Sequence, residues 1–357
     1  MVYAAHGDGS AFTMTSPALS SLPEAILEWS HCRSIEPGRR LRIGVLHNPL
    51  SGRNRRSGLD DVHHALRAFP DVRQCEVRSP PDIFSALSAF SREGIELIVV
   101  NGGDGTIQAT LTVLLTDHGT QGLPLLAVLP TGTTNMIAGD VGLRGTRPRA
   151  LQQLCAYIPS ATHGLPLLRR HVLRVQSDVH PESLCGMFFG TGGILQGIEY
   201  CRRSVASKGI RGEIGPAVAL ARFLFALVRG QNDVLQPIPL SVGVNGGPLE
   251  SSECLALFVS TLDRLFLGLR PYWGREVAPL HYTMIRANPR HLLRVVFALL
   301  RGRPHPMATW EHGYHSANVA QVQLAVPHGF TLDGELFVGK GSTVTISDAG
   351  QVSFIQF

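Results

Sequence analysis

The chain has 357 residues, of which 44% are hydrophobic and 17% charged, a globular composition that is long enough for two domains. It contains no run of about 18 apolar residues and no leader pattern, so we expect neither a transmembrane helix nor a signal peptide. The net charge of +5 favours an anionic partner, and the absence of a nucleic-acid-binding motif favours a nucleotide or an anionic membrane surface over DNA or RNA.

The first predicted domain follows an N-terminal extension. Residues 1–40 are expected to form this extension, with one short helix over 21–29. A buried strand over 41–46 then leads into a polar loop that contains Asn48, Ser51, Gly52 and Arg53. Such a loop at the carboxyl end of a strand suits an anionic ligand, although taken alone it is better explained as a solvated basic loop.

The central feature of the chain is a strand, a turn and a helix in direct succession. Helices over 60–69 and 81–91 and a strand over 74–78 come first. A strand over 95–100 then runs into Gly102-Gly103-Asp104-Gly105-Thr106 and a helix. Glycines allow a phosphate to approach the backbone N–H groups beside a helix start. Asp104 is the only charge in the turn; it could hold a metal, orient a hydroxyl or contact a nucleotide, and a simple helix cap is an equally good explanation.

A fourth strand, over 123–129, ends in another turn rich in glycine and hydroxyl groups. This turn contains Thr131, Gly132, Thr133 and Asn135. Strands that alternate with helices predict a parallel sheet, whose strands all end at the same edge. The three polar turns are therefore expected to meet there, and their coincidence is stronger evidence for a phosphate site than any one of them.

The pattern changes to β-rich from about residue 171. Apolar runs over 171–177, 184–191, 240–245, 254–260, 281–287 and 318–326 predict an antiparallel sandwich. Two helices are expected within it, over 217–228 and 289–303. The second is apolar and carries Arg290, Arg294, Arg301 and Arg303. It would lie on an anionic membrane or, equally well, pack into the core with its arginines at the rim.

The three turns, together with Asp333-Gly334-Glu335 near the C-terminus, resemble the signature blocks of the diacylglycerol kinase catalytic domain family. This family includes sphingosine, ceramide and bacterial lipid kinases, with NAD kinases and phosphofructokinases as more distant relatives. The resemblance implies a nucleotide-binding α/β domain over 41–165 and a β-rich lipid-binding domain, an antiparallel β-sandwich, over 166–338. The final strands, over 339–357, would return to the first domain.

The resemblance also implies roles for single residues in an ATP-dependent lipid kinase that uses Mg²⁺. Asp333 is the preferred catalytic base and Asp104 the competing one, favoured in the sphingosine-kinase branch. Arg53, Lys208 and Arg211 would contact phosphate. The implied nucleotide-binding residues are Asn48, Ser51, Gly52, Gly102, Gly103, Asp104, Gly105, Thr106, Thr131, Gly132, Thr133, Asn135 and Glu335.

Two departures from the family pattern leave the metal ligands open. Met136 stands where the family often has Asp, and Ala109 where it often has Glu, so Asp140 could supply a missing carboxylate. The acceptor would be diacylglycerol, ceramide or a sphingoid base. The alternatives are a kinase of a soluble acceptor, as in NAD kinases, and an inactive nucleotide- or membrane-binding module. We expect a cytoplasmic protein, peripherally bound to the inner face of the membrane, and compatible with a homodimer.

Overall fold

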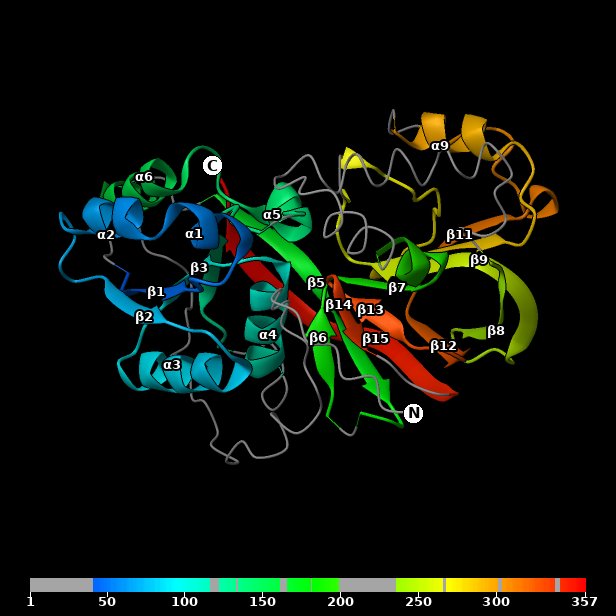
Figure 1. Ribbon diagram of the computed structural model, residues 1–357, viewed down its shortest axis with the longest axis horizontal. Coiled ribbons are helices and arrows are strands. Elements are labelled where there is room, and N and C mark those ends of the chain that lie inside the picture. The colour runs from blue at the N-terminus through cyan, green and yellow to red at the C-terminus, as the bar shows by residue number, and fades with distance from the viewer. Residues whose placement is uncertain are drawn as a thin grey trace.

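The computed structural model describes residues 41–357 apart from 116–121, 133, 161–165, 181, 199–235, 266–267, 301–303 and 338–340 (Figure 1). The helices expected over 21–29 and 217–228 lie outside these described residues. The same holds for five residues singled out in the sequence, namely Thr133, Lys208, Arg211, Arg301 and Arg303.

The first half of the chain forms a parallel sheet with the strand order β4-β3-β1-β2. Its strands are β1 (Ile43–His47), β2 (Arg73–Glu76), β3 (Leu97–Asn101) and β4 (Leu125–Val128). Along β3, alternate side chains enter different cores: Leu97 and Val99 pack on one side of the sheet, and Ile98 and Val100 on the other. Burial of both faces explains why these strands read as continuous apolar runs.

Helices cover both faces of this parallel sheet (Figure 1). α2 (Asp60–Leu66) and α6 (Arg147–Ser160) contribute to the core on one face, and α3 (Pro80–Arg92) and α4 (Asp104–Leu115) to the core on the other. α3 begins at a capping box in which Ser79 and Asp82 each bind the other's backbone N–H. Short helices α1 (Gly52–Ser57) and α5 (Met136–Val141) follow β1 and β4, where the sequence predicted turns alone.

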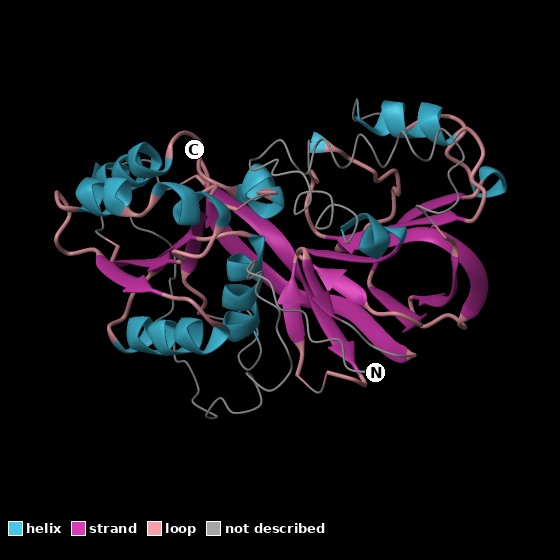
Figure 2. Ribbon diagram, in the orientation of Figure 1, coloured by secondary structure: helices cyan, strands magenta, loops and turns pink. Residues whose placement is uncertain are grey.

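The second half is antiparallel, as Figure 2 shows. Its strands are β5 (Leu167–Ser177), β6 (Leu184–Gly186), β7 (Phe188–Gly192), β8 (Ile238–Val244), β9 (Glu250–Ser260), β10 (Leu280–Arg286), β11 (Tyr314–Val319), β12 (Gln321–Val326), β13 (Phe330–Leu332) and β14 (Glu335–Phe337). The single run expected over 318–326 is divided between β11 and β12. The division falls at Ala320, where Asn245 Oδ1 accepts hydrogen bonds from the N–H groups of Ala320 and Gln321.

The long strand β15 (Ser342–Ile355) joins the two halves (Figure 1, red). It pairs antiparallel with β12 and β5, and Phe354 pairs in parallel with Leu126 of β4. All strands of the described residues therefore belong to one 15-stranded sheet. The fold is the predicted mixed one, a parallel region with flanking helices and an antiparallel region, and the two regions share hydrogen bonds through β15.

A small satellite core lies at the far end of the antiparallel region. α9 (Leu292–Leu300) contributes Val295, which packs with Ala308 and Tyr314 beside the 3₁₀ helix η3 (Trp310–His312). The helix expected over 289–303 begins later than predicted because Asn288 and His291 adopt left-handed backbone conformations, with φ of 53° and 59°. None of the helices within the described residues is long and apolar enough to cross a membrane.

Candidate active site

The three polar turns meet at the carboxyl ends of β1, β3 and β4. Asn48 Nδ2 donates to Thr106 Oγ1 over 2.8 Å, which ties the first turn to the second. The N–H of Arg53 donates to the carbonyl of Thr131 over 2.8 Å, which ties the first to the third. The second and third turns touch at their glycines. A Cβ on Gly132 would lie only 3.0 Å from the Cα of Gly103, so this approach requires glycine.

The first turn is held by residues that the sequence analysis did not single out. Asn54, buried in α1, donates from Nδ2 to the carbonyls of Asn48 and Asn101 over 2.8 and 3.0 Å. Its Oδ1 accepts from Arg147 of α6, which also pairs with Asp61 over 2.9 Å. Position 54 lay within the segment interpreted as a basic loop, and a local pattern carries no signal for a partner 93 residues away.

Within this first turn the predicted nucleotide-binding side chains bind the protein's own backbone. Ser51 Oγ donates to the carbonyl of Asn48, and Asn48 Oδ1 accepts from the N–H of Leu50. In this structure the two residues therefore shape the turn. A direct contact between either residue and a nucleotide stays a prediction.

Asp104 lies in the second turn, but it caps α5, the helix that follows the third turn. It is the first residue of α4, yet its carboxylate accepts hydrogen bonds from the N–H groups of Met136 and Ile137, both over 3.1 Å, at the start of α5. Asn135, the residue before α5, has φ of 48° and makes no capping bond of its own. Asp104 therefore supplies the cap that the local sequence lacks, which holds the second and third turns together.

Burial raises the pKa of Asp104 to about 6. The surrounding protein atoms disfavour the charged carboxylate, and the two backbone N–H groups only partly compensate. Its two hydrogen bonds are those of an ionised acceptor.

Glu335 brings the C-terminal part of the chain to the central turn. Its Oε1 lies 2.6 Å from the place that a Cβ on Gly105 would occupy, so glycine at this position makes room for the carboxylate. Glu335 is the first residue of β14, which pairs with β13 in the antiparallel region. The central turn is therefore completed by a side chain that lies 230 positions further along the chain.

Asp333 precedes β14 and is almost completely buried, with 3% of its surface exposed. Its carboxylate accepts from the N–H groups of Met187 and Phe188 at distances between 2.8 and 3.1 Å, and its own N–H donates to the carbonyl of Phe188. Its φ of 50° is left-handed, a conformation that aspartate tolerates better than most residues. These contacts fix the carboxylate against the segment that joins β6 to β7.

The pKa of Asp333 is raised well above its usual value. Removal from water is the main cause, and the negative charges of Asp104 and Glu335 add to it, while the Met187 and Phe188 N–H groups oppose it. Asp104 comes from the parallel region and Glu335 from the antiparallel region, so carboxyl groups of both halves act on Asp333.

Two buried polar atoms at the third turn have no hydrogen-bond partner in the described structure. They are Thr131 Oγ1 and Asn135 Oδ1. Buried polar atoms are normally paired, so unpartnered ones beside a glycine-rich turn suit a ligand that brings its own polar groups. A nucleotide with its phosphates fits this requirement. The protein alone offers few ligands for a metal ion. Among the described residues, no group of three or more His, Cys, Asp and Glu side chains is arranged to hold a metal ion.

The comparisons with known proteins agree with this geometry. Residues 42–163 match the family model of the diacylglycerol kinase catalytic domain. This segment is therefore similar to a diacylglycerol kinase catalytic domain. The matched range contains all three turns, and the remaining carboxylates of the site, Asp333 and Glu335, come from the chain beyond it.

Solved structures share the fold of nearly the whole chain. A protein from Bacillus anthracis str. Sterne, described as a putative diacylglycerol kinase, has 16% sequence identity and a TM-score of 0.61. Another structure, described as a diacylglycerol kinase from the same source, has 14% identity and a TM-score of 0.54. Each match covers 88% of this chain and 96% of the other. No curated protein sequence matches the chain significantly.

Two further positions of the matched segment bear on the two carboxylates of the family pattern that this sequence lacks. Asp140 was considered as a replacement, but its Oδ2 accepts from Arg170 Nε over 2.9 Å and from the N–H of Asp263 over 3.3 Å. This carboxylate joins α5 to the antiparallel region instead. Ala109 is buried in the core formed by α3 and α4, so a carboxylate there would point into apolar surroundings.

Proposed function

We propose that the protein is an ATP-dependent lipid kinase, which transfers the terminal phosphoryl group of ATP to the primary hydroxyl of a lipid. The observation that carries the proposal is the convergence of Asp104, Asp333 and Glu335 on the glycine-rich turns of a diacylglycerol kinase catalytic domain. Phosphoryl transfer requires positioning, charge neutralisation and a base beside the acceptor hydroxyl. The site offers a group for each task.

The turns would hold ATP. Backbone N–H groups at the start of α4 and the Thr131 hydroxyl would donate to its phosphates. Asn135 Oδ1 would accept from an N–H or O–H group of the nucleotide. Asp104 and Glu335 would hold Mg²⁺ together with the phosphates, an arrangement that needs only one or two protein carboxylates. Bound Mg²⁺ would neutralise charge on the transferred group.

Asp333 would serve as the base. Its Oδ2 accepts a hydrogen bond only from the Met187 N–H and therefore retains a lone pair that can take a proton. In the reaction, Asp333 takes the proton of the acceptor hydroxyl, the acceptor oxygen forms a bond to the γ-phosphorus, and the bond from that phosphorus to the β,γ-bridging oxygen breaks, leaving ADP. A raised pKa matches a base that works near neutral pH.

The acceptor would be diacylglycerol, ceramide or a sphingoid base, each of which carries a primary hydroxyl on an apolar tail. A soluble acceptor and a catalytically inactive module are the alternatives. The large antiparallel region around Asp333 supports the lipid, and the presence of Asp104, Asp333 and Glu335 supports activity.

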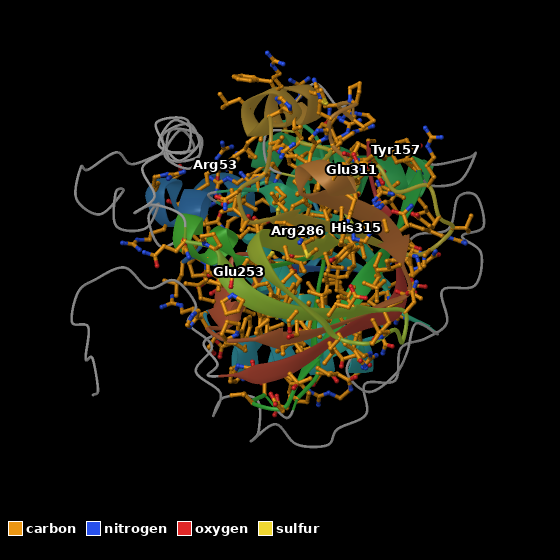
Figure 3. All side chains as sticks on the ribbon, turned by 90° about the vertical axis from the view of Figure 1, so that its right-hand side faces the viewer. Arg53, Tyr157, Glu253, Arg286, Glu311 and His315 are labelled. Carbon is orange, nitrogen blue, oxygen red and sulfur yellow. The ribbon has the colours of Figure 1, made fainter. Side chains whose placement is uncertain are left out.

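The outer surface of α9 supports peripheral membrane binding on an anionic bilayer. Leu293 and Phe297 lie one helical turn apart and are 37% and 55% exposed, and Trp310 of η3 is 50% exposed. Arg290 and Arg294 are exposed on the same segment. Arg286 lies over the Trp310 ring at 5.2 Å, and Figure 3 shows Arg286 close to His315, which also contacts Trp310. Apolar and aromatic side chains flanked by arginines are typical of helices that lie in a membrane interface.

The decisive test uses purified protein with radiolabelled ATP, Mg²⁺ and vesicles that contain diacylglycerol, ceramide, sphingosine or monoacylglycerol. A lipid kinase transfers label to one of these lipids. Folded protein that binds ATP without labelling any lipid would support the inactive module, and label in a water-soluble product without vesicle dependence would support the soluble acceptor.

A further inference from the structure

Helix α4 carries a polar stripe that faces the antiparallel region. Gln108 and Thr112 lie four and eight positions after Asp104, so all three share one face of the helix. Both are buried, and both bind the backbone of Cys185 in β6. The neighbouring Thr110 is equally buried, but its hydroxyl donates to the carbonyl of Thr106 within the same helix.

Thr112 Oγ1 uses its full hydrogen-bonding capacity at this contact. It donates to the carbonyl of Cys185 over 3.1 Å, and it accepts from the N–H of Cys185 over 3.0 Å and from Gln108 Nε2 over 3.0 Å. Gln108 Nε2 uses its second hydrogen on the same Cys185 carbonyl over 3.2 Å. A hydroxyl has one donor and two acceptor sites, so all three are occupied.

The segment that follows Cys185 holds Asp333. A Cβ on Gly186 would lie 2.5 Å from Asp333 Oδ2, so the backbone approaches the carboxylate as closely as glycine allows. Met187 and Phe188 then donate their N–H groups to the carboxylate. Cys185 is therefore hydrogen-bonded to α4, and the three residues that follow it, 186–188, lie against the Asp333 carboxylate.

We infer that Thr112, supported by Gln108, is a positioning residue that sets the place of Asp333 relative to the nucleotide turns through Cys185. α4 begins at the central turn and therefore carries the position of that turn. Hydrogen bonds to Thr112 fix Cys185 against α4, and Cys185 leads directly into residues 186–188. The N–H groups of Met187 and Phe188 in turn hold the Asp333 carboxylate. The inference rests on the proposed role of Asp333 as the base.

The test compares three variants. Thr112→Val keeps the shape of the side chain and removes the hydroxyl, Thr112→Ser restores the hydroxyl, and Thr110→Val is the matched control on the same helix. Since small displacements of catalytic groups cost up to about 100-fold, we expect Thr112→Val to lower kcat by roughly 10- to 100-fold, with the KM for ATP within about twofold of wild type. Thr112→Ser should recover most of the loss, and Thr110→Val should stay close to wild type.

Two readouts separate positioning from general damage. Withdrawal of the Met187 and Phe188 N–H groups from Asp333 removes contacts that lower its pKa, so the acid limb of the kcat profile should move to higher pH in Thr112→Val alone. Amide hydrogen exchange at 186–188 should accelerate in the same variant. Exchange needs no substrate, so it tests the coupling even if the protein proves not to be a kinase.

Wild-type kcat and unchanged exchange in folded Thr112→Val would overturn the inference, as would an equal loss in Thr110→Val. Accelerated exchange in Thr112→Val with an unchanged acid limb and kcat would also overturn it, because the coupling would then not reach the reaction. Absence of activity in the wild type on every acceptor would instead reject the proposed function.

Discussion

The carboxylate of Glu335 occupies the space beside Gly105 that a side chain at position 105 would need. The two residues lie 230 positions apart in the sequence, and their contact closes the central turn. Because the atom in the way is the end of a side chain and not backbone, the contact can be disturbed without unfolding the protein.

The variant Gly105→Ala tests this contact. Alanine favours a helix over glycine by about 1 kcal/mol, so we expect the melting temperature to stay at or above that of the wild type. We expect kcat/KM for ATP to fall by about 10- to 100-fold, because Glu335 must move away from the turn. Gly139→Ala, in α5 with open space around its Cβ, is the matched control: it gains the same helix preference and should leave kcat/KM for ATP unchanged. Normal kinetics in Gly105→Ala would remove Glu335 from nucleotide handling.

The two aspartates should respond differently to substitution by asparagine. Loss of a general base costs about 10²- to 10⁴-fold, so Asp333→Asn should lower kcat by this factor and leave ATP affinity nearly intact. Asp104→Asn loses one of the two carboxylate oxygens that accept N–H groups of α5, and it should weaken ATP binding together with turnover. Calorimetric ATP binding and single-turnover rates distinguish the two cases. Normal turnover in Asp333→Asn, beside an inactive Asp104→Asn that binds ATP well, would place the base at Asp104.

The raised pKa values predict an unusual pH dependence. The base must be deprotonated, so kcat should rise with pH, with its acid limb well above the pKa of about 3.9 at which an ordinary aspartate ionises. The limb belongs to the coupled carboxyl groups as a set. Glu335→Gln removes a negative charge that raises the pKa of Asp333, so the limb should shift to lower pH in that variant. A wild-type limb near pH 4 would contradict the prediction.

Membrane binding should depend on α9. Each arginine near an anionic bilayer contributes on the order of 1 kcal/mol, so Arg290→Gln with Arg294→Gln should weaken vesicle binding by roughly 30-fold at low salt. The charge-matched control is Arg67→Gln with Arg92→Gln, which changes two exposed arginines, one directly after α2 and one at the end of α3. Phe297→Ser should weaken binding at every salt concentration, because its contribution is apolar. Co-sedimentation unaffected by salt and by all these changes would leave α9 as a packed helix.

Local patterns in the sequence were sufficient for the parallel strands, for α2, α3 and α4 and for the three polar turns, but they predicted neither α6 nor the short strands β13 and β14. Periods of 2.0 and 3.6 residues report which faces are buried, and the strands of a parallel sheet end at one edge, so the meeting of Asn48, Thr106 and Thr131 followed without coordinates. The motif resemblance added Asp333 and Glu335. The domain boundaries, and the roles of Lys208 and Arg211, stay predictions.

The tertiary structure alone decided which groups these residues bind. Asp104 was expected to cap its own helix or to contact a ligand, and it caps α5. The sequence analysis did not single out Asn54 or Arg147, which hold the first turn. Thr112 was likewise not distinguished from the other threonines with apolar neighbours. In each case a buried polar atom found a partner more than 30 positions away. Such pairings depend on how packed elements approach in space, because any donor brought near a buried acceptor can satisfy it, and no local spacing encodes that approach.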